Sequence, residues 1–351
     1  MIELRIYDPS LNFKGVIENH TSLVWTRKYF TTGQFEMRCP ITPYNLTLIA
    51  LGNIIWKRDS VEAGVIESIE LAQNNIHNQM TVRGRFLESY MDRRLIRPFY
   101  YINNGYVETA MRAILSGAVT IPLVQLGDVK GFTEKVTFQA TYKNLLAYEE
   151  KLSRYSGIGF RFIPDFTDKT ITFDLYKGLD RSFGQSARNR VVFSEDYNNL
   201  SEATYYLNNQ IQKNVVYVGG QGEGSQRTFV TVGDDASTGL ARRELFINAA
   251  DISQEGLTTA EYEAALAQRG NNALEENALA ETFECVTEAV GNFTYKAEYD
   301  LGDIVTVQKK SWGITTALRI TEIMEAYENG AYSVIPTFGN PLSETIDWED
   351  T

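Results

Sequence analysis

Residues 1–90 contain short runs in which apolar and polar side chains alternate, and turn residues separate these runs. Alternation with a period of two places one set of side chains on each face of a β-strand. The runs are also rich in β-branched and aromatic residues, which favour strands. Their roughly regular spacing predicts a small barrel or sandwich, and we assign residues 1–94 to a first β-barrel domain. The runs are 4–7, 22–25, 33–38, 53–57, 64–70 and 79–84.

The pattern changes after residue 94, where helical spacing begins. Residues 105–116 place apolar side chains at i, i+3, i+4, i+7 and i+8, and Gly117 follows as a helix-ending residue. A second helix is expected from Thr141 to Gly157, followed by a hairpin of strands 159–163 and 170–176. We therefore assign residues 95–185 to an α+β domain.

Strand patterns return near residue 190 and continue to residue 336, with one long helix between them. Thr258 and Glu261 fit a capping box at the start of this helix, and Gly270 inside it suggests a kink or break. We assign residues 186–340 to a second β-barrel domain with a helical insertion at 255–281, and 341–351 to a C-terminal tail. The predicted fold class is mainly β with an α+β insertion: two small β-barrel domains, an α/β domain and a long inserted helix.

Charge and composition exclude several classes of protein. The 351 residues include 45 acidic and 33 basic side chains, giving a net charge of −12, which is the wrong sign for binding nucleic-acid phosphates. The start of the chain lacks a secretory signal pattern, and no run of 18 apolar residues predicts a membrane span. We therefore expect no specific nucleic-acid binding and no membrane insertion. Cys39 and Cys285 are expected to be buried free thiols.

The sequence offers no recognisable catalytic, cofactor-binding or metal-binding residues. His20 and His77 both lie in polar turns, where we expect exposed side chains, and the adjacent carboxylates fit solvated surface charge. The glycine cluster at 219–224 lacks the lysine of a phosphate-binding loop and leads into a strand, which favours a hairpin tip. We expect no enzyme activity, no cofactor and no metal.

Two groups of residues are candidates for an interface. The first is the basic cluster Arg83, Arg85, Arg93 and Arg94, whose expected partners are carboxylates within the protein or across a subunit boundary. The second is the glycine-rich loop, because loops on rigid β scaffolds often contact partners. Its candidate residues are Gly219, Gln221, Glu223 and Ser225.

Loose patterns spread over nearly the whole chain carry a resemblance to a known family. The most telling is Tyr-Asp-Leu-Gly-Asp-Ile-Val-Thr-Val at 299–307, in which a tight turn at Gly302 and Asp303 precedes an alternating strand. The others lie at 25–36, 52–56, 64–70, 82–96, 242–253 and 319–323. In these segments the chain resembles the phage tail hub proteins, also called tail-associated or baseplate hub proteins, close to the Siphovirus ReqiPepy6 Gp37-like group.

The resemblance implies a structural hub protein of a phage or prophage tail tip or baseplate. It implies a homotrimeric ring that closes the distal tail tube, carries tip or lysin components and opens for DNA passage. The implied partners are tail tube and distal tail proteins, the tape-measure protein and a separate spike or peptidoglycan hydrolase. The implied location is the virion tail, assembled in the bacterial host cytoplasm. We expect polar and acidic side chains to line the channel, with the arginines of 83–97 directed toward interfaces.

A carbohydrate-binding or glycan-hydrolysing protein directed at the cell wall is the alternative function. It draws on the aromatic content of 20 Tyr, 18 Phe and 4 Trp, because aromatic rings stack on sugars. Most of these aromatic residues fall at strand positions, where they more often fill a core. Oligomeric mass and a glycan-hydrolysis assay separate the two functions.

Overall fold

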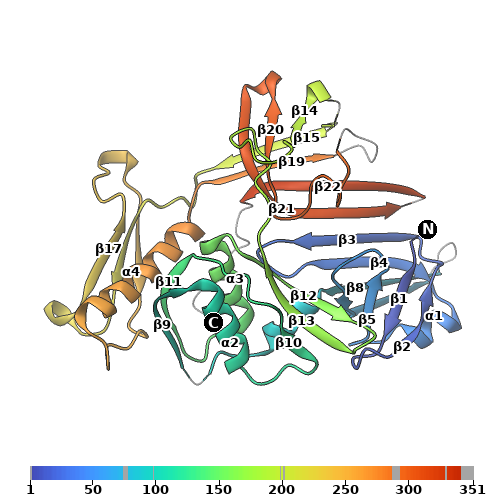
Figure 1. Ribbon diagram of the computed structural model, residues 1–351, viewed down its shortest axis with the longest axis horizontal. Coiled ribbons are helices and arrows are strands. Elements are labelled where there is room, and N and C mark those ends of the chain that lie inside the picture. The colour runs from blue at the N-terminus through green and yellow to red at the C-terminus, as the bar shows by residue number, and fades with distance from the viewer. Residues whose placement is uncertain are drawn as a thin grey trace.

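Figure 1 shows a computed structural model of the chain, in which sheets and helices form an elongated molecule with one projecting lobe. The structure describes residues 2–73, 78–97, 99–197, 199–200, 202–286, 293–328 and 330–340. His77 therefore lies outside the described residues. Within this part of the chain, no helix is both long and apolar enough to cross a membrane.

The largest element is a sheet of ten strands that draws on both ends of the chain. Eight of them form one antiparallel path in the order β15-β19-β22-β21-β3-β4-β8-β7, and β14 and β20 extend it beside β21. The strands are β3 (Ser22–Lys28), β4 (Gln34–Pro40), β7 (Ser68–Gln73), β8 (Asn78–Arg85), β14 (Val192–Ser194), β15 (Glu202–Asn208), β19 (Ala280–Val286), β20 (Ile304–Lys309), β21 (Ile314–Glu328) and β22 (Ala331–Asn340).

This sheet corrects the expectation of two β-barrels. The described strands close no barrel; instead β3 of the first β region pairs with β21 of the second over seven residues. Both strands have the period-two pattern, so their edges satisfy each other's backbone hydrogen bonds, and sequence alternation alone does not indicate which edges meet. The prediction of a mainly β fold with an α+β part holds, and the boundaries at 94 and 185 stay predictions.

A second, smaller sheet covers part of the large one. It has the order β2-β1-β5-β6 and is made of β1 (Leu4–Tyr7), β2 (Phe13–Ile17), β5 (Ile54–Lys57) and β6 (Gly64–Val65). Leu4 and Ile6 from this sheet pack with Leu23, Trp25 and Met37 from the large sheet in one buried core. The short helix α1 (Pro43–Leu48), capped by Thr42, was not expected from the sequence.

The α+β part contains the two predicted helices. α2 (Val107–Gly117) buries its apolar stripe, and α3 (Leu145–Ser156) ends at Gly157 in the left-handed conformation. The predicted second helix thus starts at Leu145 and not at Thr141, because Asn144 provides the N-cap. The strands are β9 (Tyr100–Tyr106), β10 (Val124–Leu126), β11 (Lys135–Ala140), β12 (Gly159–Asp165) and β13 (Thr170–Tyr176), and the 3-10 helix η1 (Leu87–Arg93) precedes them.

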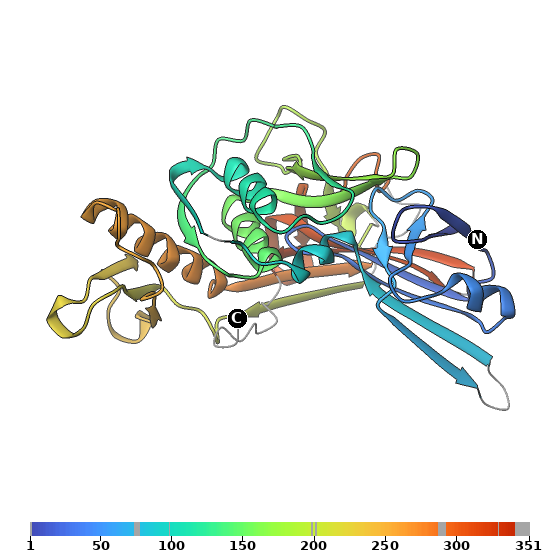
Figure 2. The same cartoon turned by 90° about the horizontal axis from the view of Figure 1, so that it is seen from below.

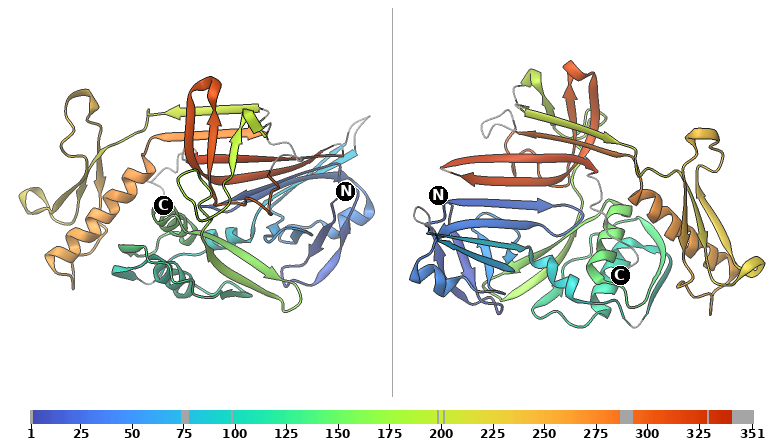
Figure 3. Two further views of the ribbon diagram at one scale, coloured as in Figure 1. Left: turned by 45° about the horizontal axis from the view of Figure 1, so that its top comes forward. Right: turned by 180° about the vertical axis from the view of Figure 1, so that it is seen from behind.

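The projecting lobe is a three-stranded sheet covered on one face by α4 (Thr259–Glu276), as Figure 3 shows. Its strands are β16 (Val215–Gly219), β17 (Phe229–Gly233) and β18 (Glu244–Asn248). The capping box of Thr258 and Glu261 is confirmed. α4 lies within the predicted helical insertion at 255–281, and together with the three strands it buries a core of its own. The helix does not break at Gly270, whose missing side chain lets α4 approach Val218 and Val232.

The structure tests the expected burial of two side chains, His20 and Cys39. His20 is only 6% exposed, which contradicts its assignment as an exposed turn residue, because the turn directs Glu18 and Asn19 outward instead. Burial lowers the pKa of His20. Cys39 is a buried free thiol, as expected, and burial raises its pKa to about 11.

Buried charges connect the two β regions. The Arg27 guanidinium in β3 donates to both oxygens of Glu62 and to Asp300, and Arg27 and Glu62 are almost fully buried. Burial opposes ionisation of Arg27, but these carboxylates outweigh it and raise its pKa well above the ordinary value. A buried cation of this kind is stable only with such partners, so the contact fixes how the two regions pack.

Candidate interaction face

One face of the large sheet is open and polar. Figure 2 shows these strands along one side of the molecule, with α2 and α3 on the other side. Strand alternation directs Phe35, Met37 and Val82 into the core and leaves polar neighbours on the open face. These neighbours line a groove of about 540 Å³. Its lining residues are Val24, Thr26, Gln34, Phe35, Glu36, Arg38, Glu67, Ser68, Arg83, Gly84, Arg85 and Glu328.

Arg83 and Arg85 of the predicted interface lie in this groove, each beside carboxylates. The Arg83 guanidinium lies 2.7 Å from Glu36 and 3.1 Å from Glu70. Its hydrogen bond to Glu36 lowers the pKa of that carboxyl. Arg85 contacts Glu67 at 2.9 Å. The expectation of ion pairs within the protein is therefore confirmed for both arginines.

Arg93 and Arg94 lie beyond the edge of the groove. Arg93 reaches Glu67 at 3.4 Å and lies over the ring of Tyr90. Arg94 instead donates to the backbone carbonyls of Val119 and Arg93. Arg85 and Arg93 share the Glu67 carboxylate, whereas Arg83 pairs with Glu36 and Glu70. Arg94 has no carboxylate partner among the described residues. Whether any of them contacts a subunit stays a prediction.

The second predicted group lies in the lobe, at the opposite end of the molecule in Figure 1. Residues 220–228 connect β16 to β17, which confirms the hairpin, and Glu223 and Ser225 are exposed. Gln221 is held by its N–H, which donates to Tyr262 at 2.6 Å. A side chain at Gly219 would collide with the Arg227 guanidinium. The loop and the arginine cluster are therefore separate surfaces.

The sequence analysis assigned adjacent carboxylates such as Glu67 and Glu70 to solvated surface charge, and it did not identify which carboxylates pair with Arg83 and Arg85. Glu36 alternates with the apolar residues of β4. Glu67 directly precedes β7, and Glu70 lies within β7. The alternation of side chains along β4 indicates that Glu36 faces away from the core. The identity of its partner depends on the register of β4 against β8, which pairs Glu36 with Arg83.

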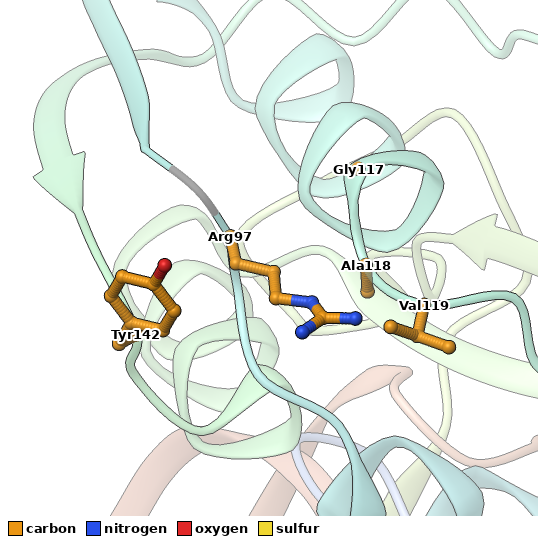
Figure 4. A pocket seen from close by; sticks show the side chains of 5 residues that line it. All are labelled: Arg97, Gly117, Ala118, Val119 and Tyr142. Atoms are coloured by element: carbon orange, nitrogen blue, oxygen red, sulfur yellow. The ribbon is translucent and has the colours of Figure 1, made fainter.

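A second hollow lies on the α+β part, and Figure 4 shows it from close by. It has a volume of about 340 Å³ and is lined by Arg97, Gly117, Ala118, Val119 and Tyr142. In Figure 4 the Arg97 side chain extends between the Tyr142 ring and the residues that follow α2. No group of three His, Cys, Asp or Glu side chains that could hold a metal ion occurs in the described part of the chain.

The comparison with protein families decides the membership of this chain. The model of the family described as Siphovirus ReqiPepy6 Gp37-like protein matches residues 3–340. The chain belongs to this family. The match includes the ten-stranded sheet, the α+β part and the lobe.

Three solved structures that share this fold are described as tail proteins. A tail protein from Neisseria meningitidis MC58 has a TM-score of 0.61 at 12% identity, covering 96% of each chain. The 43 kDa tail protein of prophage MuSo2 from Shewanella oneidensis has a TM-score of 0.60 at 12% identity, covering 97% of this chain and 99% of the other. Prophage tail protein gp18 from Listeria monocytogenes EGD-e has a TM-score of 0.58 at 13% identity, with 97% and 95% covered. No curated protein matches the chain.

Proposed function

We propose that this chain is a structural hub protein of a phage or prophage tail, and that three copies form a ring at the distal end of the tail tube. Family membership and the tail-protein fold support a tail component. The resemblance to hub proteins is the basis for proposing three copies in the ring. The observation that carries the ring is the open edge at each end of the eight-strand path.

The two edges suit a head-to-tail contact between copies. β7 pairs with β8 alone and β15 with β19 alone among the described strands, so each has one unpaired side. Successive strands along this path run in opposite directions, so β15 and β7, the first and last of the eight, are antiparallel to each other. Rotation about an axis along the strands therefore brings β7 of one copy antiparallel to β15 of the next. Such a contact closes into a ring when the rotation is one third of a turn.

The open sheet face suits the wall of a passage for DNA. It presents hydroxyls, amides and paired charges, so Arg83 and Arg85 are already neutralised by carboxylates and do not hold phosphates strongly. β8, which carries both arginines, lies next to the edge strand β7 and thus close to the proposed subunit boundary. This position supports the expected interface role of the arginine cluster.

The proposed location is the virion tail, after assembly in the host cytoplasm. The proposed partners are tail tube and distal tail proteins, the tape-measure protein and a separate spike or peptidoglycan hydrolase. We propose a mechanical role with no catalytic step. The buried positions of Trp25, Tyr29 and Phe283 support a packing role for many of the aromatics that motivated the carbohydrate alternative.

Light scattering of the purified chain over a range of concentrations tests the ring. Leu71 in β7 and Leu207 in β15 are each 55% exposed, and lysine at either position opposes edge pairing. We expect Leu71→Lys and Leu207→Lys to abolish a trimer that the matched surface variant Leu46→Lys retains. A chain that stays monomeric at every concentration, and also under cross-linking in tail particles, would contradict the ring. Glycan turnover by the monomer would favour the alternative function.

A further inference from the structure

The projecting lobe has a hydrophobic core of its own and shares none with the rest of the chain. Its core comes from α4 and the three strands and includes Val216, Tyr262 and Leu266. Among the described residues, this core contains no side chain from outside the lobe, and the three other buried cores contain none from residues 215–276. Domains that share no apolar core are free to move relative to each other unless other contacts hold them.

Polar side chains make contacts between the lobe and the α+β part. Figure 1 shows α4 between the three strands of the lobe and the α+β part, and α4 packs beside α3 and β11. We call this contact the joint. The Asn103 side chain donates to Glu261 across it at 3.1 Å, and the Lys143 ammonium lies 3.9 Å from Asp251.

Charges of opposite sign also interact across the joint. Burial lowers the pKa of Lys151 in α3 to about 8, and the Glu276 carboxylate at the end of α4 opposes this shift. Burial raises the pKa of Glu276, and Lys151 and Arg154 of α3 oppose that shift. Both sides of the joint therefore lose hydration on contact, which offsets much of their attraction.

Two neighbouring links connect the lobe to the large sheet. β15 ends at Asn208 and β19 begins at Ala280, and these two residues are paired. On the lobe side, the N–H of Lys213 donates to the carbonyl of Asn277 at 2.9 Å. The two links therefore start together and end together. A hinge requires only a few residues of this kind between elements.

We propose that the lobe is a movable arm with an electrostatic latch. It docks on α3 and β11 through the charged joint, and it swings out about residues 209–212 and 278–279, which lie between the paired ends of the links. Undocking returns the charges of the joint to water and separates no apolar core, so the docked and free positions are close in free energy. The inference does not depend on the proposed ring, since it concerns a joint within one chain.

Distances measured by electron paramagnetic resonance between the lobe and the α+β part test the latch. Thr231 in β17 and Ser116 in α2 are exposed, and spin labels attached there through genetically encoded azide residues leave the native cysteines in place. An excess of unlabelled chain keeps each measured distance within one chain. We expect one narrow distance at low salt. A second, broad distribution should hold about half of the chains or more at about 1 M NaCl, because salt screens the charges of the joint.

Charge reversal in the joint should release the lobe at low salt. Lys143→Glu and Lys151→Glu place a new carboxylate near Asp251 and Glu276 respectively, so each should produce the broad distribution. Lys14→Glu is the matched control, because Lys14 is an exposed lysine of β2 in the small sheet. It should keep the single narrow distance. The salt series uses the wild type, so the test does not depend on the folding of any variant.

Three outcomes would overturn the proposal. A narrow distance that stays unchanged at high salt and in both joint variants would show that the lobe is fixed. A broad distribution in the wild type at low salt would show that the lobe moves without a latch. Equal broadening in Lys14→Glu would assign the effect to net charge and not to the joint.

Discussion

The Lys57 ammonium lies 2.7 Å from the Glu325 carboxylate, and neither side chain is exposed to solvent. Lys57 belongs to β5 of the small sheet, and Glu325 belongs to β21 near the C-terminal end of the chain. The same Glu325 oxygen accepts hydrogen bonds from the hydroxyls of Tyr327 and Tyr332. The pair therefore joins the first and second β regions inside the protein.

Lys57→Met should destabilise the protein by about 3–5 kcal/mol, because it removes the buried cation of Glu325 and leaves only Lys296, 3.7 Å away. Urea unfolding followed by circular dichroism measures the change. The double variant Lys57→Met/Glu325→Leu should recover much of the loss, since it removes both buried charges. A double variant less stable than the single one would show that the pair itself, and not the orphaned carboxylate, governs the effect.

Stability should fall between pH 4.5 and about 8 through Glu88. Burial raises the pKa of Glu88 from 4.5 to about 8, with one oxygen accepting from the N–H of Phe162. The folded protein holds this proton and the unfolded chain releases it near pH 4.5, so rising pH favours unfolding until about pH 8. Glu88→Gln should flatten this dependence, by on the order of a few kcal/mol over the interval. Urea midpoints from pH 5 to 8.5 check it, and equal slopes in both proteins would refute the assignment.

Gly302→Ala should destabilise the protein by at least about 2 kcal/mol. Gly302 has a φ of 92°, and a Cβ there would lie 2.2 Å from the ring of Tyr29. The substitution therefore adds backbone strain to a collision with a buried side chain. Gly313→Ala is the control, because it has a similar positive φ but open space around it. A similar loss in both variants, measured by thermal unfolding, would assign the effect to backbone strain alone.

Arg83→Ala should change the free energy of unfolding by only about 0–1 kcal/mol, because its ion pairs with Glu36 and Glu70 are exposed. If the residue lies near a subunit boundary, the same change should lower the assembled fraction in light scattering. An unfolding change well above 1 kcal/mol would instead give this arginine a structural role within the chain.

The sequence by itself determined local structure and the faces of the strands. Period-two alternation predicted a strand over 33–38, where β4 lies, and the capping box of Thr258 and Glu261 located the start of α4, because both signals depend on neighbours in the chain. The turn at Gly302 was also visible. The sequence did not show that Gly302 must also leave room for the Tyr29 ring.

Only the tertiary structure decided which strand edges meet and which charges pair. The pairing of β3 with β21 joins segments far apart in sequence, and it replaced the two expected barrels with one open sheet. The same arrangement brings Lys57 to Glu325 and buries both. Backbone edges carry the same donors and acceptors in every strand, so their choice of partner depends on how whole faces pack, which no local pattern encodes.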